Sequence, residues 1–186
     1  HLNSSPSRTQ TTLTGEFVKS NSKQIKPKIT TDAKIVTLKN KASWKKLFHG
    51  FTEMYGVTYM SSPQFLLSLF DEQGFEKVEL LIGHGLVEGY REKLNGKESA
   101  VERLYGFVQE KCLTIYGTKA TNHAKMYILK KEGLTRVIIG SPNLSYTAEG
   151  SRQREICVYW DIEESDIGGQ EILRQAMENY EIMLNE

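Results

Sequence analysis

The stretch that decides the fold of this 186-residue chain is residues 123–129, HAKMYIL, together with residues 140–145, GSPNLS. Polar and apolar side chains alternate over 123–129, which predicts a β-strand with His123 and Lys125 on one face. The second segment opens with a tight turn, Gly-Ser-Pro-Asn, which follows another strand predicted over 135–139. Strand ends and turns of this kind commonly form the anion sites of α/β proteins.

Strands and helices alternate before this stretch, and mostly strands follow it. Strands are predicted over residues 33–38, 57–60, 77–82, 112–116, 123–129, 135–139 and 155–160. Helices are predicted from Ser43 to Gly56, after Ser62, over 99–110 and over 170–184, while the glycine-rich segment 83–96 predicts a loop with a short helical piece. This order favours an α/β sandwich, a mixed sheet flanked by helices, over a helical bundle or a β-barrel.

The composition is that of an ordinary globular domain, with 39% hydrophobic and 25% charged residues. No apolar run approaches the roughly 20 residues of a membrane span, and no secretory signal is recognisable, so a cytoplasmic location is expected. The only two cysteines, Cys112 and Cys157, form no CxxC pattern, so neither a disulfide framework nor a cysteine zinc site is implied.

The net charge of +1 hides a strong segregation of charge. Residues 1–46 hold ten Lys and Arg against two acidic residues, and residues 155–186 hold nine acidic residues against Arg174. Such an asymmetry favours a surface that binds a polyanion. Residues 1–30 are polar and basic with few large apolar groups, so we predict a flexible basic arm there and a catalytic domain over 31–186.

A carboxylate and a further histidine complete the candidate site residues. Glu155 opens the strand predicted over 155–160, and it could accept a hydrogen bond from Nδ1–H of His123, leaving Nε2 free as a nucleophile. His84 follows the end of the strand predicted over 77–82 and is a candidate for the mouth of the site. No pair of acidic residues with metal-ligand spacing accompanies these groups, so neither a divalent metal nor another cofactor is called for.

His-x-Lys at 123–125, Gly-Ser-x-Asn at 140–143 and Glu155 resemble the HxK(x)4D and GSxxN signature of the phospholipase D superfamily. The resemblance is greatest to its single-motif nuclease branch, which includes metal-independent restriction endonucleases.

The resemblance implies a role for each matching residue. His123 would be the nucleophile, Lys125 and Asn143 would hold phosphate oxygens, Ser141 would be a supporting contact, and Glu155 would orient the histidine. The chain departs from the signature at one position, because Lys130 stands where the superfamily has Asp. We include Lys130 with Ser141 and His84 among the candidate substrate-binding residues. The departure weakens a lipase interpretation more than a nuclease one.

Cleavage of a phosphodiester without metal needs one imidazole to attack phosphorus and a second to protonate the leaving oxygen. This chain has one His-x-Lys motif. The second imidazole would therefore come from a two-fold homodimer in which both copies of His123 face one composite site, or from another part of a longer parent chain.

The function predicted is a metal-independent phosphodiesterase that cleaves nucleic acid, with DNA favoured over RNA, as the nuclease module of a restriction or helicase-associated enzyme. One alternative is a catalytically inactive phospholipase D-like domain that only binds nucleic acid. A phospholipase would need a membrane-binding amphipathic segment, and the nearest candidate, residues 50–69, has the pattern of protein core. A general interaction domain would explain the charge but not the motif.

Overall fold

The computed structural model of the chain describes residues 32–38, 41–83, 86–118, 121–145 and 154–186. The predicted basic arm, residues 1–30, lies outside these ranges, and so does His84. Among the described helices, none has the length and apolar character that crossing a bilayer requires.

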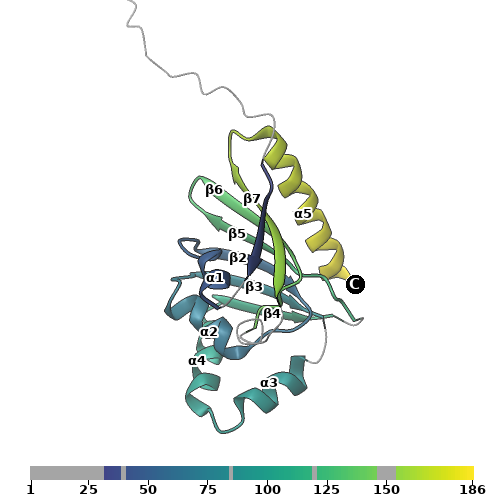
Figure 1. Ribbon diagram of the computed structural model, residues 1–186. Helices are drawn as coiled ribbons and strands as arrows, with labels where there is room; N and C mark the ends of the chain where they lie inside the picture. The colour runs from purple at the N-terminus through teal and green to yellow at the C-terminus, as the bar shows by residue number, and fades with distance from the viewer. Residues whose placement is uncertain (1–31, 39–40, 84–85, 119–120, 146–153) are drawn as a thin grey trace, which may run out of the picture.

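A mixed seven-stranded sheet forms the centre of the molecule, with the strand order β1-β7-β6-β5-β2-β3-β4 (Figure 1). The strands are β1 Lys34–Leu38, β2 Glu53–Thr58, β3 Lys77–Ile82, β4 Leu113–Gly117, β5 Met126–Lys131, β6 Leu134–Gly140 and β7 Glu155–Glu163. β2, β3 and β4 are parallel neighbours, and all other neighbouring pairs are antiparallel. The predicted α/β sandwich with a mixed sheet is therefore confirmed.

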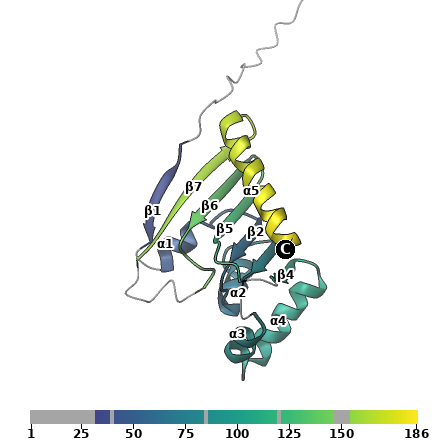
Figure 2. The same ribbon diagram turned by 90° about the vertical axis from the view of Figure 1, so that its right-hand side faces the viewer.

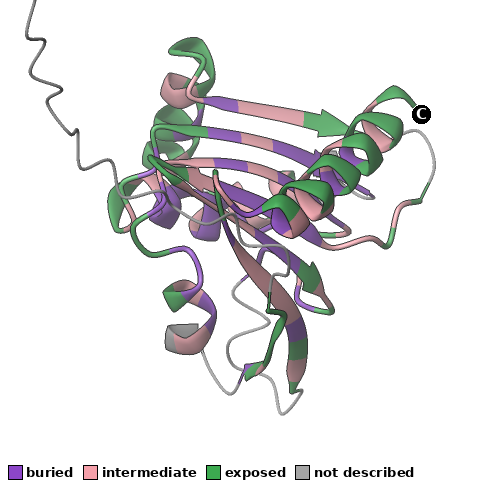
Figure 3. Cartoon of the chain, turned by 90° about the horizontal axis from the view of Figure 1, so that it is seen from above, coloured by how far each residue is buried: buried purple, intermediate pink, exposed green. Residues whose placement is uncertain are grey.

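Helices cover both faces of this sheet. They are α1 Lys41–Lys46, α2 Pro63–Asp71, α3 Leu86–Leu94, α4 Glu98–Gln109 and α5 Ile167–Asn185. α3 and α4 lie beside the β2–β3–β4 end of the sheet, away from β1 (Figure 2). α5 lies across the opposite face from α1 and α2, and its own outer surface is exposed (Figure 3). Side-chain caps mark two helix starts, since Ser62 accepts from Phe65 N–H and Asp166 from Gly169 N–H.

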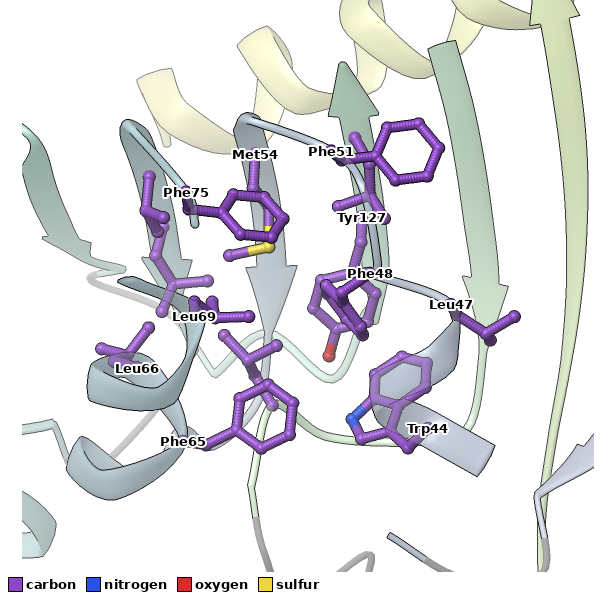
Figure 4. Close-up of a cluster of buried hydrophobic side chains, with 14 of the residues drawn as sticks. Trp44, Leu47, Phe48, Phe51, Met54, Phe65, Leu66, Leu69, Phe75 and Tyr127 are labelled. Carbon is purple, nitrogen blue, oxygen red and sulfur yellow. The ribbon is translucent and has the colours of Figure 1, made fainter. Parts of the chain in front are cut away.

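The main core lies between the sheet and the helices α1, α2 and α4, and it is rich in aromatic side chains (Figure 4). Trp44 meets Phe48 and Tyr127 edge to face, with ring centroids 4.8 and 5.5 Å apart. A smaller core on the other face packs α5, through Ala176 and Tyr180, against the sheet. The sheet is thus covered on both sides, as an α/β sandwich requires.

Three predicted elements differ from the structure. The helix expected from Ser43 to Gly56 ends at Lys46, and β2 covers 53–58 instead of 57–60. Gly56 lies inside β2, where a Cβ would come 3.0 Å from the Leu80 side chain, so its lack of a side chain serves packing rather than helix termination. Residues 86–94, expected to be mainly loop, form the regular helix α3.

A partly buried ion pair joins the outer strands. The guanidinium of Arg136 on β6 donates to both carboxylate oxygens of Asp161 on β7, at 2.6 and 3.0 Å, and it lies 4.6 Å from the Tyr159 ring centroid. Lys34 on β1 donates to the same carboxylate at 3.0 Å. Burial raises the pKa of Asp161, but hydrogen bonds from Arg136 and Lys34 outweigh this effect and hold the pKa below its ordinary value of 3.8.

We expect Asp161→Asn to lower the free energy of unfolding by about 2 kcal/mol at pH 7, because it leaves the half-buried Arg136 charge without its carboxylate. The pKa of Asp161 is lower in the folded chain than in the unfolded chain. Its stabilising effect is therefore present above pH 4 or so and is lost as the pH falls through the folded-state pKa. Urea unfolding at pH 7 and pH 3 measures both effects, with the exposed Glu76→Gln as a control of little expected effect. A gap as large at pH 3 as at pH 7 would contradict this account.

Candidate active site

His123 and Lys125 lie just before β5, which begins at Met126 rather than at His123. Neither residue therefore belongs to the strand that was expected to align their side chains. Instead, both residues contact Tyr59, which directly follows β2. The imidazole of His123 stacks on the Tyr59 ring at 4.0 Å with the planes 16° apart, and Lys125 Nζ lies 5.7 Å from the ring centroid.

The orientation of Lys125 is fixed further by a hydrogen bond. Its Nζ donates to the backbone oxygen of His123 at 2.7 Å. The ammonium is thus held at the backbone of His123, whose side chain is exposed. A cation and an exposed imidazole that both contact Tyr59 can receive an anionic group of a substrate.

Asn143, in the turn after β6, faces the same region of the chain. Its Oδ1 accepts a hydrogen bond from Met60 N–H at 3.2 Å and lies 3.4 Å from Thr58 Oγ1. Because the oxygen is engaged with residues 58–60, the Nδ2 group is the part of the amide left to donate to another partner. An amide donor is the group required to hold a phosphate oxygen.

A buried hydrogen-bond network fixes the turn that carries Asn143. Tyr127 Oη donates to Pro142 O at 2.9 Å, and Thr58 Oγ1 accepts from Leu144 N–H at 3.2 Å. Burial raises the pKa of Tyr127 above its ordinary value, so the phenol stays protonated and acts as a donor. The backbone N–H of Ser62 also donates to Leu144 O at 2.9 Å. The turn is therefore anchored to the end of β2.

Gly140 and Ser141 join this turn to β7. A Cβ on Gly140 would lie 2.5 Å from Ile156 O, so only glycine fits at this close approach. Ser141 Oγ hydrogen-bonds to the Glu155 carboxylate and accepts from Ile156 N–H at 3.1 Å. Within the described residues Glu155 is paired with Ser141 and makes no hydrogen bond to His123. Its expected role in orienting the histidine stays a prediction.

Lys130 lies apart from these groups. It sits near the far end of β5, beside Glu53 in the sheet, with its Nζ 4.8 Å from the Tyr55 ring centroid. Five residues of extended chain separate it from Lys125, a span of about 16 Å. The structure therefore does not bring Lys130 to the other candidate residues. The remaining candidate, His84, falls outside the described ranges.

A pocket of about 220 Å³ opens beside the imidazole. Its lining consists of Thr118, Thr121, Asn122, His123, Met183 and Glu186. Asn122 approaches Gly83 so closely that a Cβ there would lie 2.0 Å from Asn122 O. In the described parts of the chain, no three His, Cys, Asp or Glu side chains are grouped as metal ligands.

Sequence reasoning missed Thr58, Tyr59 and Tyr127. These residues contact the motif residues or the turn that carries Asn143. The missed signal was the position of residues 58–60, at the carboxyl end of a strand in the parallel part of the sheet, where α/β proteins usually bind ligands. A strand predicted over 57–60 hid this, because it placed Tyr59 inside the strand rather than after it.

The mixed sheet, with the His-x-Lys segment and the Gly-Ser-x-Asn turn meeting at one end of its central strands, defines a phospholipase D-like α/β domain. The family model described as the NgoFVII restriction endonuclease N-terminal PLD domain matches residues 38–182. The chain belongs to this family, and the resemblance seen in the sequence is confirmed.

Two solved structures show the same fold. Nuc, a phospholipase D family member from Salmonella typhimurium, is 14% identical, with a TM-score of 0.53 over 84% of this chain and 95% of that one. Phosphatidylserine synthase from Haemophilus influenzae is 12% identical, with a TM-score of 0.53 over 83% of this chain and 38% of that one. No curated protein sequence matches significantly.

Proposed function

We propose that this chain is a metal-independent phosphodiesterase that cleaves nucleic acid through a phosphohistidine on His123, as the nuclease module of a restriction or helicase-associated enzyme. The family gives its coarse class, a nuclease or phosphodiesterase domain of the phospholipase D type. The observation that carries the proposal is that the exposed imidazole of His123 and the Lys125 ammonium both contact Tyr59, while the Asn143 amide is anchored to the same segment, residues 58–60.

Each group has a chemical role in this proposal. A ring nitrogen of His123 attacks phosphorus, and the bond between phosphorus and the leaving oxygen breaks as a second imidazole protonates that oxygen. Lys125 and the Nδ2 group of Asn143 donate to the non-bridging oxygens, where negative charge accumulates. Water then attacks the phosphohistidine, the second imidazole takes its proton, and His123 is released.

A nucleic-acid substrate is supported by the family and by the charge of the chain. The matching family model describes a restriction endonuclease domain, which favours DNA over RNA. Ten Lys and Arg among residues 1–46 supply positive charge that a phosphate backbone attracts.

The second imidazole would come from a second copy of the chain, packed about a two-fold axis with both copies of His123 in one site. An apolar surface beside His123 suits such an interface. A pocket of about 490 Å³ between α5 and the sheet is lined mainly by apolar side chains and begins at Ala124, next to His123. Ile139 and Ile156, 42% and 55% exposed, extend this surface over β6 and β7.

One observation favours a second candidate function, a domain that binds nucleic acid without cutting it. Glu155 is engaged with Ser141 rather than with the imidazole of His123, so no described carboxylate fixes the tautomer of the proposed nucleophile. A protein that binds DNA but cleaves no phosphodiester under any condition would support this alternative.

We expect cleavage to persist in millimolar EDTA, because the imidazole and lysine supply the nucleophile and the charge stabilisation. Binding should weaken as salt rises, since Lys125 and the basic residues neutralise phosphates. Cleavage of labelled DNA with EDTA, and with added magnesium, measures the first effect, and a salt titration of binding measures the second. Activity that disappears with EDTA and returns with magnesium would show that the mechanism is wrong for this chain.

A further inference from the structure

We propose that Tyr59 is the positioning residue that orients the imidazole of His123 for its attack on phosphorus, an inference that rests on the proposed function. The two rings are stacked with centroids 4.0 Å apart and planes 16° apart. The imidazole is exposed, and among the described residues none forms a hydrogen bond with its ring nitrogens. The stack on Tyr59 is therefore the contact that defines the plane of the imidazole.

The backbone that carries Tyr59 is itself fixed on both sides. Thr58 O, at the end of β2, accepts a hydrogen bond from Gly83 N–H at 2.9 Å, and Met60 N–H donates to Asn143 Oδ1 at 3.2 Å. A group that positions a nucleophile has to be held more rigidly than the nucleophile itself. Tyr59 meets this condition because one neighbour belongs to the sheet and the other is bound to a motif residue.

Stacking can orient a nucleophilic imidazole without occupying either of its nitrogens. Both ring nitrogens lie in the plane of the ring, so a contact on the ring face leaves one nitrogen free to attack and the other free to hold a proton. The face of a tyrosine ring also attracts a cation, and the imidazole gains positive charge when its nitrogen bonds to phosphorus.

The Tyr59 ring contacts both motif residues, His123 and Lys125. Lys125 Nζ lies 5.7 Å from the Tyr59 centroid and donates to the backbone oxygen of His123. Tyr59, His123 and Lys125 therefore form one packed unit. Loss of the ring should misplace the nucleophile relative to the ammonium that stabilises the transition state, which affects kcat more than KM.

The test compares Tyr59→Leu, which removes the ring, with Tyr59→Phe, which keeps it. We expect kcat of Tyr59→Leu to fall roughly 10- to 100-fold with KM little changed, and kcat of Tyr59→Phe to stay within about threefold of the unmutated protein. Tyr105→Leu is the matched control, because Tyr105 is an exposed tyrosine on α4, and it should leave kcat unchanged. Thermal unfolding checks that each variant is folded.

A spectroscopic measurement separates positioning from a general loss of structure. Stacking on an aromatic ring shifts the carbon-bound protons of the imidazole upfield in the NMR spectrum, and the signals of His123 are those that disappear in His123→Ala. We expect the upfield shift in the unmutated protein and in Tyr59→Phe, and its loss in Tyr59→Leu.

Three results would overturn the proposal. They are the absence of the upfield shift from the unmutated protein, unchanged kcat in Tyr59→Leu, and a Tyr59→Phe variant as impaired as Tyr59→Leu, which would assign the role to the hydroxyl. The first needs no variant of Tyr59, so the proposal stays testable even if Tyr59→Leu does not fold. If the unmutated protein shows the shift but cleaves nothing, the proposed function fails while the stacking itself stands.

Discussion

His123→Ala should lose phosphodiesterase activity by a factor of at least about 10³. Alanine can neither attack phosphorus nor carry the proton of the leaving oxygen, and in a dimer the substitution would remove both imidazoles at once. The fold should be unaffected, because the His123 side chain is exposed and contributes to neither core. Cleavage assays on single-stranded DNA, double-stranded DNA and a chromogenic phosphodiester measure the loss.

The control for this variant is His49→Ala, the same substitution at another exposed histidine. His49 lies beyond the end of α1, and its neighbour Gly50 lies beside Lys131, at the opposite end of β5 from the candidate site. Full activity is expected for it. Cleavage by purified His123→Ala at the unmutated rate would disprove the assignment of the nucleophile, whereas no cleavage by the unmutated protein would favour the binding-only function.

The fold could be predicted from the sequence to the level of its class and family. The His-x-Lys and Gly-Ser-x-Asn motifs are local, so their spacing is visible without knowledge of the folded chain, and the matching family model confirms the resemblance they carry. The alternation of strands and helices predicted the mixed sheet for the same reason, since periodicity is a property of neighbouring residues.

The elements that were placed wrongly depend on distant contacts. Gly89 and the other glycines around α3 favour a loop, but Tyr90 Oη donates to Ser61 Oγ at 3.0 Å and Lys93 Nζ to Ser61 O at 3.5 Å. These bonds to a residue near α2 stabilise a helix that local propensity does not favour. In the same way, the spacing of Trp44 and Phe51 predicted one continuous helix. In the structure, the short helix α1 and the turn after it bury both side chains.

The candidate site could be predicted only as far as its motif residues. Tyr59 precedes His123 by more than sixty positions, so no local pattern relates the two rings. The partner of Glu155 also depends on the sheet, because Gly140 pairs with Cys157 and this register brings Ser141 beside Glu155. Lys130 was included from its position in the motif, but the direction of β5 carries it away from the site.

We expect heterodimers of unmutated and His123→Ala subunits to lose most of their activity, because each chain has one His-x-Lys motif. The composite site would need one imidazole to attack and another to protonate the leaving oxygen, so a heterodimer would lack one of them. The apolar surface that begins at Ala124 lies directly beside His123, which would place the two-fold axis close to both imidazoles.

Heterodimers can be isolated by co-expressing the two subunits with different affinity tags and purifying through both. Sedimentation equilibrium gives the oligomeric state, and heterodimers with His49→Ala subunits serve as the control that should keep full activity. The shared-site mechanism requires that the His123→Ala heterodimer be nearly inactive. Its one remaining His123 imidazole cannot both attack phosphorus and protonate the leaving oxygen, because these two events take place on opposite sides of the phosphorus. A monomer at micromolar concentration that still cleaves, or a heterodimer that keeps half its activity or more, would contradict a shared site. A monomer that does not cleave would instead indicate that a longer parent chain supplies the second motif, or the contacts that pair two copies.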